Sequence, residues 1–214
     1  MGGLEKGEVA SAHVIAKFKN WFKSDFPNII SNVNYDDIKY QWNEIVQMEN
    51  ERIADFGKES GVSLGTTLTA SLFANNKVFI MHVGDSRFYT ITDSGLNIET
   101  EDQTLVAREV RRGNMTPKQA ETDPRRNVLL QCVGASKVVK PQYLELNLES
   151  NTTYMLCSDG FRHKVNEGEI VEAFSPKTLI DKQTMLLNSK KLVELNKQRK
   201  ETDNITVLLI KTFN

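Results

Sequence analysis

The sequence predicts an α+β fold in a single domain. Helical patterns come first along the chain, strand patterns with tight connections fill the middle, and further strands are followed by helices and a last strand. Strands that follow one another through tight turns favour antiparallel pairing, because parallel pairs need long crossover connections. This order of elements is typical of layered α+β proteins. The 214 residues are enough for one domain with a sizeable core.

Two amphipathic helices are predicted before the first strand, over Gly7 to Phe22 and Asp36 to about Lys58. Each has apolar residues mostly at helical spacing, which indicates one buried face. The face of the first helix consists of Ala10, Val14, Phe18 and Trp21, and that of the second of Ile38, Trp42, Ile45, Ile53 and Phe56. Both tryptophans are expected in the core. The stretch between the helices, Ser24 to Asn34, is predicted to be turn-rich.

Strands follow in the middle of the chain. Thr66 to Ala74 and Lys77 to Val83 are rich in Thr, Val, Ile and Phe, and Asn75-Asn76 between them is a hairpin signal. Later strands are predicted over Phe88 to Ile91, Tyr143 to Leu148, Tyr154 to Cys157 and Ile205 to Lys211. The region from Asp102 to Arg126 reads as helical, with Pro117 and Pro124 as breakers, and two more helices are predicted over Glu167 to Phe174 and Leu179 to Lys197.

Composition excludes several classes of protein. A formal net charge of −1 provides no basic surface, so nucleic acid is not expected as a partner. No apolar stretch approaches the roughly 20 residues that cross a bilayer, so no membrane contact is expected, and the first residues do not resemble a secretory signal. Cys132 and Cys157 do not make a disulfide framework and are expected to be buried thiols. These features predict a cytoplasmic protein.

Three aspartates stand beside turn residues at the ends of apolar strands. They are Asp85, Asp159 and Asp203. Carboxylates converging on one point repel one another unless a cation lies between them. Hard oxygen ligands suit Mg²⁺ or Mn²⁺, and the three histidines lack the spacing of a zinc motif. Taken singly, each aspartate is also typical of a turn, and the metal hypothesis rests on all three together.

Other phosphoryl-transfer chemistries fit less well. A cysteine-dependent phosphatase needs an Arg six positions after the cysteine, whereas Arg162 lies five positions after Cys157. An aspartyl-phosphate enzyme needs a second Asp two residues before Asp159, and this sequence has Cys157 at that position. The sequence also lacks the P-loop motif of a nucleotide-binding site. Water activated by a metal ion is the route that remains.

The chain resembles the metal-dependent, type 2C serine/threonine protein phosphatases, especially their compact bacterial members. The motifs that carry the resemblance are Gly2-Gly3 with Gly7-Glu8-Val9-Ala10-Ser11, Gly65-Thr66-Thr67, Val83-Gly84-Asp85-Ser86-Arg87, Cys157-Ser158-Asp159-Gly160 and Asp203-Asn204-Ile205-Thr206-Val207. The resemblance implies an α/β/β/α four-layer sandwich, in which two antiparallel β-sheets are flanked by helices. It covers residues 1–214 as a single catalytic domain, with a flap-like segment at about 102–134.

The resemblance also implies roles and partners. Asp159 and Asp203 would serve the binuclear metal pair and the catalytic step, and Asp85 with Asp159 would hold a third ion, so two to three Mn²⁺ or Mg²⁺ ions are expected. The implied reaction is hydrolysis of phosphoserine or phosphothreonine in proteins by a metal-activated hydroxide. The expected partners are phosphorylated proteins, the substrates of a cognate serine/threonine kinase.

The sequence departs from the family pattern at its beginning. The family has an Asp-Gly metal-binding pair directly before the Met-Gly-Gly with which this sequence starts. We therefore expect an N-terminally incomplete domain, less active and less stable than a longer chain. Gln103 and Asp123 also stand where bacterial relatives usually have His. The alternative hypothesis is a catalytically dead pseudophosphatase that acts as a regulatory binding module.

Overall fold

The computed structural model describes residues 7–213, which form two compact units. The first unit comprises the described residues up to Gly84 together with Asp102–Leu146, and the second comprises Asp85–Glu101 together with the residues from Asn147 onward. Each unit has its own hydrophobic core. The single domain expected over residues 1–214 stays a prediction, and the Gly2-Gly3 motif lies outside the described residues.

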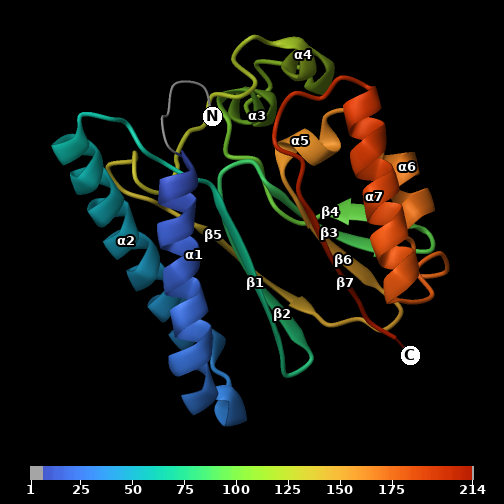
Figure 1. The fold of residues 1–214 in the computed structure, drawn as a ribbon, viewed down its shortest axis with the longest axis horizontal. Coiled ribbons are helices and arrows are strands. Elements are labelled where there is room, and N and C mark those ends of the chain that lie inside the picture. The colour runs from blue at the N-terminus through green and yellow to red at the C-terminus, as the bar shows by residue number, and fades with distance from the viewer. Residues whose placement is uncertain (1–6, 214) are drawn as a thin grey trace. The chain divides into compact units, whose positions relative to one another are not determined.

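Two long helices open the first unit. Helices α1 (Gly7–Ser24) and α2 (Tyr35–Ser60) lie side by side in Figure 1, with two short 3₁₀ turns between them, Phe26–Asn28 and Ile30–Asn32. The side chain of Asn34 caps α2 by accepting from the backbone N–H of Asp36, and Gly61 ends it with a positive φ of 67°. Both helices match the predicted ones within two residues.

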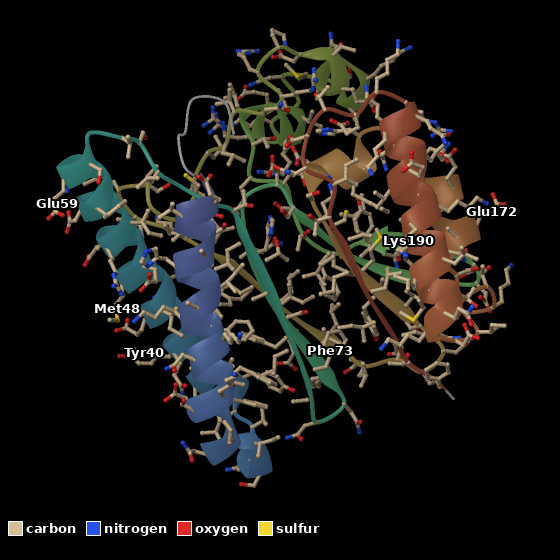
Figure 2. The ribbon with its side chains drawn as sticks, viewed as in Figure 1. Tyr40, Met48, Glu59, Phe73, Glu172 and Lys190 are labelled. Carbon is tan, nitrogen blue, oxygen red and sulfur yellow. The ribbon has the colours of Figure 1, made fainter. Side chains whose placement is uncertain are left out.

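The packing of α1 and α2 follows the predicted faces with one exception. Trp21 and Trp42 are buried, and their rings pack edge to face with the ring centroids 5.4 Å apart. Phe56, expected on the buried face, is 45% exposed, because it lies in the last turns of α2 and borders a pocket. Glu49 and Asn50 are buried in the same helix. Tyr40, Met48 and Glu59 project away from the core in Figure 2.

The first unit also contains a three-stranded sheet. Its order is β1 (Leu68–Ala74), β2 (Lys77–Val83) and β5 (Gln142–Asn147). β1 and β2 form the predicted antiparallel hairpin. Asn75 and Asn76 connect them, with φ values of 48° and 57°, which asparagine tolerates better than most residues. Apolar side chains of this sheet join those of α1 and α2 in one core.

Two short helices lie in the segment predicted to include a flap, α3 (Leu105–Arg111) and α4 (Pro117–Thr122). Pro117 was predicted to break a helix, but it begins α4. It stands directly after the cap residue Thr116, where a missing N–H costs nothing. Thr116 and Gln119 form a reciprocal capping box.

The second unit contains a four-stranded antiparallel sheet in the order β4-β3-β6-β7. The strands are β3 (Arg87–Thr92), β4 (Gly95–Ile98), β6 (Thr153–Cys157) and β7 (Val207–Lys211). Strand β4 was not predicted. The other three lie where strand patterns were recognised. The described residues therefore form two antiparallel sheets, each in a unit that also contains helices.

Helices α5 (Asp159–Arg162), α6 (Glu167–Phe174) and α7 (Lys182–Gln198) complete the second unit. Helix α6 coincides with its prediction, and α7 begins three residues later than predicted because Asp181 caps it. Figure 1 shows α6 and α7 side by side, and their apolar residues share a core with β3 and β6. Among residues 7–213, no helix is long and apolar enough to cross a membrane.

Candidate functional site

The three predicted aspartates lie beyond the same end of the second sheet. Antiparallel pairing aligns the first residue of β3, the last of β6 and the first of β7, which are Arg87, Cys157 and Val207. Asp85 precedes β3 by two residues, Asp159 follows β6 by two, and Asp203 precedes β7 by four. The three segments were predicted to converge, and the pairing of the strands brings them to one edge of the sheet.

Hydrogen bonds hold the segments of Asp159 and Asp203 against each other. The Ser158 hydroxyl donates to the carbonyl of Asn204 at 2.9 Å and accepts from the backbone N–H of Thr206 at 3.0 Å. A Cβ atom on Gly160 would lie 2.6 Å from the Asn204 carbonyl oxygen and 3.1 Å from the Cβ of Asp203. The loop before β7 can approach Asp159 this closely because residue 160 has no side chain.

The carboxylates are partly fixed by the backbone. Oδ1 of Asp159 accepts from the N–H of Gly160 at 2.8 Å, and Oδ1 of Asp203 accepts from the N–H of Asn204 at 2.7 Å. Oδ2 of each aspartate takes no part in these two bonds. The carbonyl of Asp85 accepts from the Arg162 guanidinium at 3.1 Å, which ties the loop before β3 to helix α5.

The chemistry of these donors fits a hard divalent cation. Mg²⁺ prefers oxygen ligands and is commonly bound through one or two carboxylates, water and substrate phosphate rather than through a full cage of protein side chains. Within residues 7–213, no three His, Cys, Asp or Glu side chains are close enough to hold a metal ion together. The described side chains therefore offer a sparse set of ligands of the right type.

Two further side chains at this edge were not found by sequence reasoning. His163 Nε2 lies 3.8 Å from Asp159 Oδ2, and His163 Nδ1 lies 3.5 Å from Glu201 Oε2. Glu201 Oε1 accepts from the backbone N–H of Asp203 at 3.0 Å. The spacing of four residues between Asp159 and His163 could have indicated one helix face, but helix α5 is too short to give a periodic pattern.

The residue before Asp85 is fixed within the first unit. Gly84 has a φ of 114°, and a Cβ there would lie 2.3 Å from Cγ2 of Thr67. The N–H of Gly84 donates to the side-chain oxygen of Gln103 at 2.9 Å, and the Gln103 amide nitrogen donates to the His82 carbonyl at 3.2 Å. Gln103, one of the residues that depart from the family pattern, thus connects segment 102–134 to the end of β2.

Arg87 and the two cysteines have structural surroundings. The Arg87 guanidinium donates to the Tyr89 hydroxyl at 3.4 Å. Burial raises the pKa of Tyr89 to about 12. Cys132 and Cys157 are both buried, as expected, and burial raises the pKa of the Cys132 thiol. A raised pKa disfavours the thiolate, so Cys132 is a poor nucleophile.

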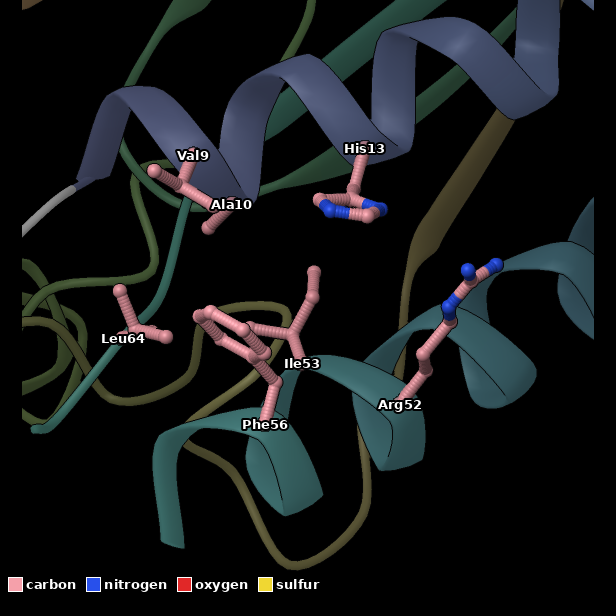
Figure 3. A pocket seen from close by; sticks show the side chains of 7 residues that line it. All are labelled: Val9, Ala10, His13, Arg52, Ile53, Phe56 and Leu64. Carbon is pink, nitrogen blue, oxygen red and sulfur yellow. The ribbon is translucent and has the colours of Figure 1, made fainter. Parts of the chain in front are cut away.

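A separate pocket of about 180 Å³ lies in the first unit between α1 and α2 (Figure 3). Its lining is mainly apolar and comprises Val9, Ala10, His13, Arg52, Ile53, Phe56 and Leu64. It contains none of the three aspartates. No carboxylate is among the described residues that line it, and the carboxylate edge of the second unit is the candidate site.

Comparisons with known proteins give a consistent picture. The family "Protein phosphatase 2C" matches residues 6–197. A putative protein phosphatase 2C-type of Streptococcus pyogenes is 29% identical over 212 residues, which cover 98% of this chain and 82% of the relative. The serine/threonine phosphatase stp of Listeria monocytogenes is 32% identical over 214 residues, with 98% and 81% covered. The phosphatase PstP of Mycobacterium tuberculosis is 31% identical, and the chain spans 38% of its length.

Solved structures agree. The phosphatase Stp1 of Staphylococcus aureus superposes with a TM-score of 0.86 at 27% identity, over 100% of this chain and 81% of that one. PstP of M. tuberculosis superposes with a TM-score of 0.80 at 31% identity, over 100% and 86%. The catalytic domain of PstP in complex with two manganese ions gives 0.77 at 30% identity, over 100% and 85%. The shared fold is α+β, with two antiparallel sheets flanked by helices.

Proposed function

The chain belongs to the protein phosphatase 2C family of metal-dependent serine/threonine protein phosphatases, and we propose that it hydrolyses phosphoserine and phosphothreonine in proteins with the help of Mn²⁺ or Mg²⁺. The observation that carries the proposal is the meeting of three aspartate segments at one edge of the second sheet. Gly160 supports it, because its missing side chain allows the Asp203 loop to lie against Asp159.

In this proposal Asp159 and Asp203 are the principal metal ligands, and Asp85 contributes with Asp159 to a further ion. The backbone bonds to Oδ1 of Asp159 and of Asp203 orient each carboxylate. When bound, the divalent ions would supply positive charge that activates water and offsets the charge of the phosphoryl oxygens. The protein's own contribution is to hold the carboxylates in place before the substrate arrives.

The number of ions is part of the proposal. A relative of 30% identity was crystallised with two manganese ions, which supports at least a binuclear site here. We propose two tightly held ions and a third, weaker one that involves Asp85. The flap role of segment 102–134 is likewise proposed. Its two short helices and the bonds of Gln103 to the end of β2 are compatible with an anchored, exposed excursion of the chain.

The test is hydrolysis of a phosphothreonine peptide with and without Mn²⁺. We expect turnover that requires Mn²⁺ and falls by at least about 100-fold in Asp159→Asn, because that change removes a charged ligand. Asp55→Asn is the matched control, since Asp55 is an exposed residue on α2 that pairs only with Lys58 at 2.8 Å among the ion pairs of the described residues. Turnover in Asp159→Asn equal to that of Asp55→Asn would refute the assigned role.

A second candidate is a binding module that keeps the phosphatase fold without catalysis. It is favoured by one observation, that no three potential ligand side chains within residues 7–213 converge on a metal position. A folded, monodisperse protein that binds a phosphothreonine peptide without hydrolysing it in Mn²⁺ would favour this candidate. Mn²⁺-dependent release of phosphate would exclude it.

We further propose that the substrates are proteins phosphorylated by a cognate serine/threonine kinase in the cytoplasm. The named relatives are serine/threonine phosphatases, which supports this class of substrate. Two buried thiols are compatible with a reducing compartment. Comparison of phosphoprotein levels in cells with and without the protein would identify substrates, and unchanged phosphoserine and phosphothreonine levels would contradict the proposal.

A further inference from the structure

Glu201 is a buried carboxylate on the loop that leads from α7 to β7. Its side chain is 6% exposed. Oε1 accepts from the backbone N–H of Thr202 at 2.9 Å and from that of Asp203 at 3.0 Å. The Glu201 N–H donates to the carbonyl of Asn196 in α7 at 3.0 Å. Through its side chain and its backbone together, Glu201 therefore sets the backbone of Asp203 relative to the end of α7.

The other oxygen of Glu201 is in an unusual position. Oε2 is buried and has no hydrogen-bond partner among the residues that the structure describes. A buried carboxylate oxygen without a partner is costly, so its retention needs a reason. The imidazole of His163 lies close to this oxygen, with Nδ1 at 3.5 Å.

His163 connects this carboxylate with Asp159. Its Nε2 lies 3.8 Å from Asp159 Oδ2, so the ring stands between Glu201 on one side and Asp159 on the other. Both distances exceed those of good hydrogen bonds, and the ring acts as a spacer that keeps the two carboxylates apart. The backbone N–H of His163 donates to the backbone carbonyl of Asp159 at 3.0 Å, which fixes the backbone of His163 relative to Asp159.

Asn196 of α7 also links helix α5 to the loop that carries Glu201. Asn196 is fully buried, and its amide donates to the carbonyl of Phe161 at 2.9 Å. The backbone N–H of Glu201 donates to the backbone carbonyl of the same Asn196. Asp159 and Asp203 are thus joined by two routes, one through Asn196 and one through His163 and Glu201.

We propose that Glu201 and His163 are positioning residues for the divalent-cation site, Glu201 through the backbone of Asp203 and His163 through the carboxylate of Asp159. Neither residue belongs to the motifs that carry the family resemblance. The inference rests on the proposed function, because it takes Asp159 and Asp203 as metal ligands. Residues that orient metal ligands typically alter metal affinity about 10- to 100-fold when they are replaced.

The deciding experiment is calorimetric titration of the metal-free protein with Mn²⁺, which requires no catalysis. Glu201→Ala removes the acceptor of the Thr202 and Asp203 N–H groups, and we expect it to weaken Mn²⁺ binding at least about tenfold. Glu201→Gln keeps an oxygen at the same place and is expected to stay within about threefold of the unmodified chain. This rescue separates positioning from the effect of the negative charge.

Asp181→Ala is the matched control. The Asp181 carboxylate also accepts a backbone N–H, that of Thr184 at 2.7 Å, but it lies at the opposite end of α7. We expect this variant to lower the melting temperature of the metal-free protein without changing its Mn²⁺ affinity. His163→Ala leaves the loop bonds of Glu201 in place and is expected to weaken binding several-fold. It decides the matter if Glu201→Ala does not fold.

The outcomes are distinguishable. If the unmodified chain binds no Mn²⁺, the proposed metal site fails and this inference fails with it. If the unmodified chain binds Mn²⁺ and Glu201→Ala binds it equally well, the inference alone is wrong. A Glu201→Gln variant as weak as Glu201→Ala would also overturn it, because charge rather than position would then be what matters.

Discussion

Replacing Gly160 by alanine should push the two aspartate segments apart. A Cβ at residue 160 would lie 2.6 Å from the Asn204 carbonyl oxygen, and an ordinary contact begins at 3.4 Å, so the oxygen must retreat by about 0.8 Å. The obstacle is backbone, which cannot rotate away as a flexible side chain can. The loop that moves also carries Asp203.

Two energies oppose each other in this variant. Alanine is favoured over glycine in a helix by about 1 kcal/mol. Overpacking against a backbone atom costs about 1–3 kcal/mol. The clash should prevail, with a net loss of about 1 kcal/mol and a melting temperature lower by about 3 °C. The larger effect should be catalytic, because a displacement of this size at a reacting site can cost about 100-fold in rate.

The assay combines thermal melting of the metal-free protein with Mn²⁺-dependent hydrolysis of a phosphothreonine peptide. Gly7→Ala is the control, since a Cβ there meets the Gly65 carbonyl oxygen at an ordinary distance of 3.7 Å and no other atom within 4 Å among residues 7–213. The control should melt at or above the temperature of the unmodified chain and retain its activity. If Gly160→Ala has the melting temperature and the turnover of the unmodified chain, the close approach of the Asp203 loop to residue 160 is not needed for stability or for catalysis.

Three further predictions concern the second unit. Hydrogen bonds from Arg199, with one from a backbone N–H, lower the pKa of Glu169 from its usual 4.5 to about 2. The stabilisation is therefore complete above pH 4.5 and is lost as the pH falls towards 2; melting curves of Glu169→Gln should differ from those of the unmodified chain at pH 6 and converge with them near pH 2, whereas a constant difference would contradict this. Phe161→Ala should lower the free energy of unfolding in urea by about 3–5 kcal/mol, because the ring is fully buried, and a loss below about 1 kcal/mol would refute its place in the core. Burial should make Tyr89 ionise near pH 12, as it should Tyr143, so Tyr89→Phe should reduce the late component of the ultraviolet titration by one tyrosine, and a smaller component near pH 10 instead would contradict it.

Much of the fold could be predicted because its signals are local. The strand Lys77 to Val83 and the helix Glu167 to Phe174 were predicted with the observed bounds. Strand β4 escaped notice because Gly95–Ile98 has only two apolar residues, too few to show alternation. Its place as a strand comes from pairing with β3.

Burial inside α2 shows where local patterns fail. Asn50 interrupts the apolar face, yet it is buried because its side chain bonds to Gly134 and Ser136, which are more than 80 residues away in the sequence. Phe56 has the residue type of a core position and is 45% exposed. Periodicity reports which face of a helix is apolar, but not which distant chain segment covers each turn.

The candidate site divides in the same way. Asp85, Asp159 and Asp203 were recognisable because each stands at a strand end next to a turn residue, and the sheet register then aligns those ends. His163 and Glu201 gave no such signal. They approach each other only because α5 and the loop after α7 meet in space.

The second unit is assembled from two stretches of chain, with Asp102–Leu146 between them. During synthesis β3 and β4 emerge as a hairpin long before β6, the strand that pairs with the other side of β3, and β7 emerges after that. A lone two-stranded hairpin is marginally stable, and distant pairing cannot repay its closure entropy until both partners exist. A nascent chain that has not yet produced β7 therefore lacks the aligned strand ends that bring the segments of Asp85, Asp159 and Asp203 together, and this edge of the sheet can assemble only after β7 has been made.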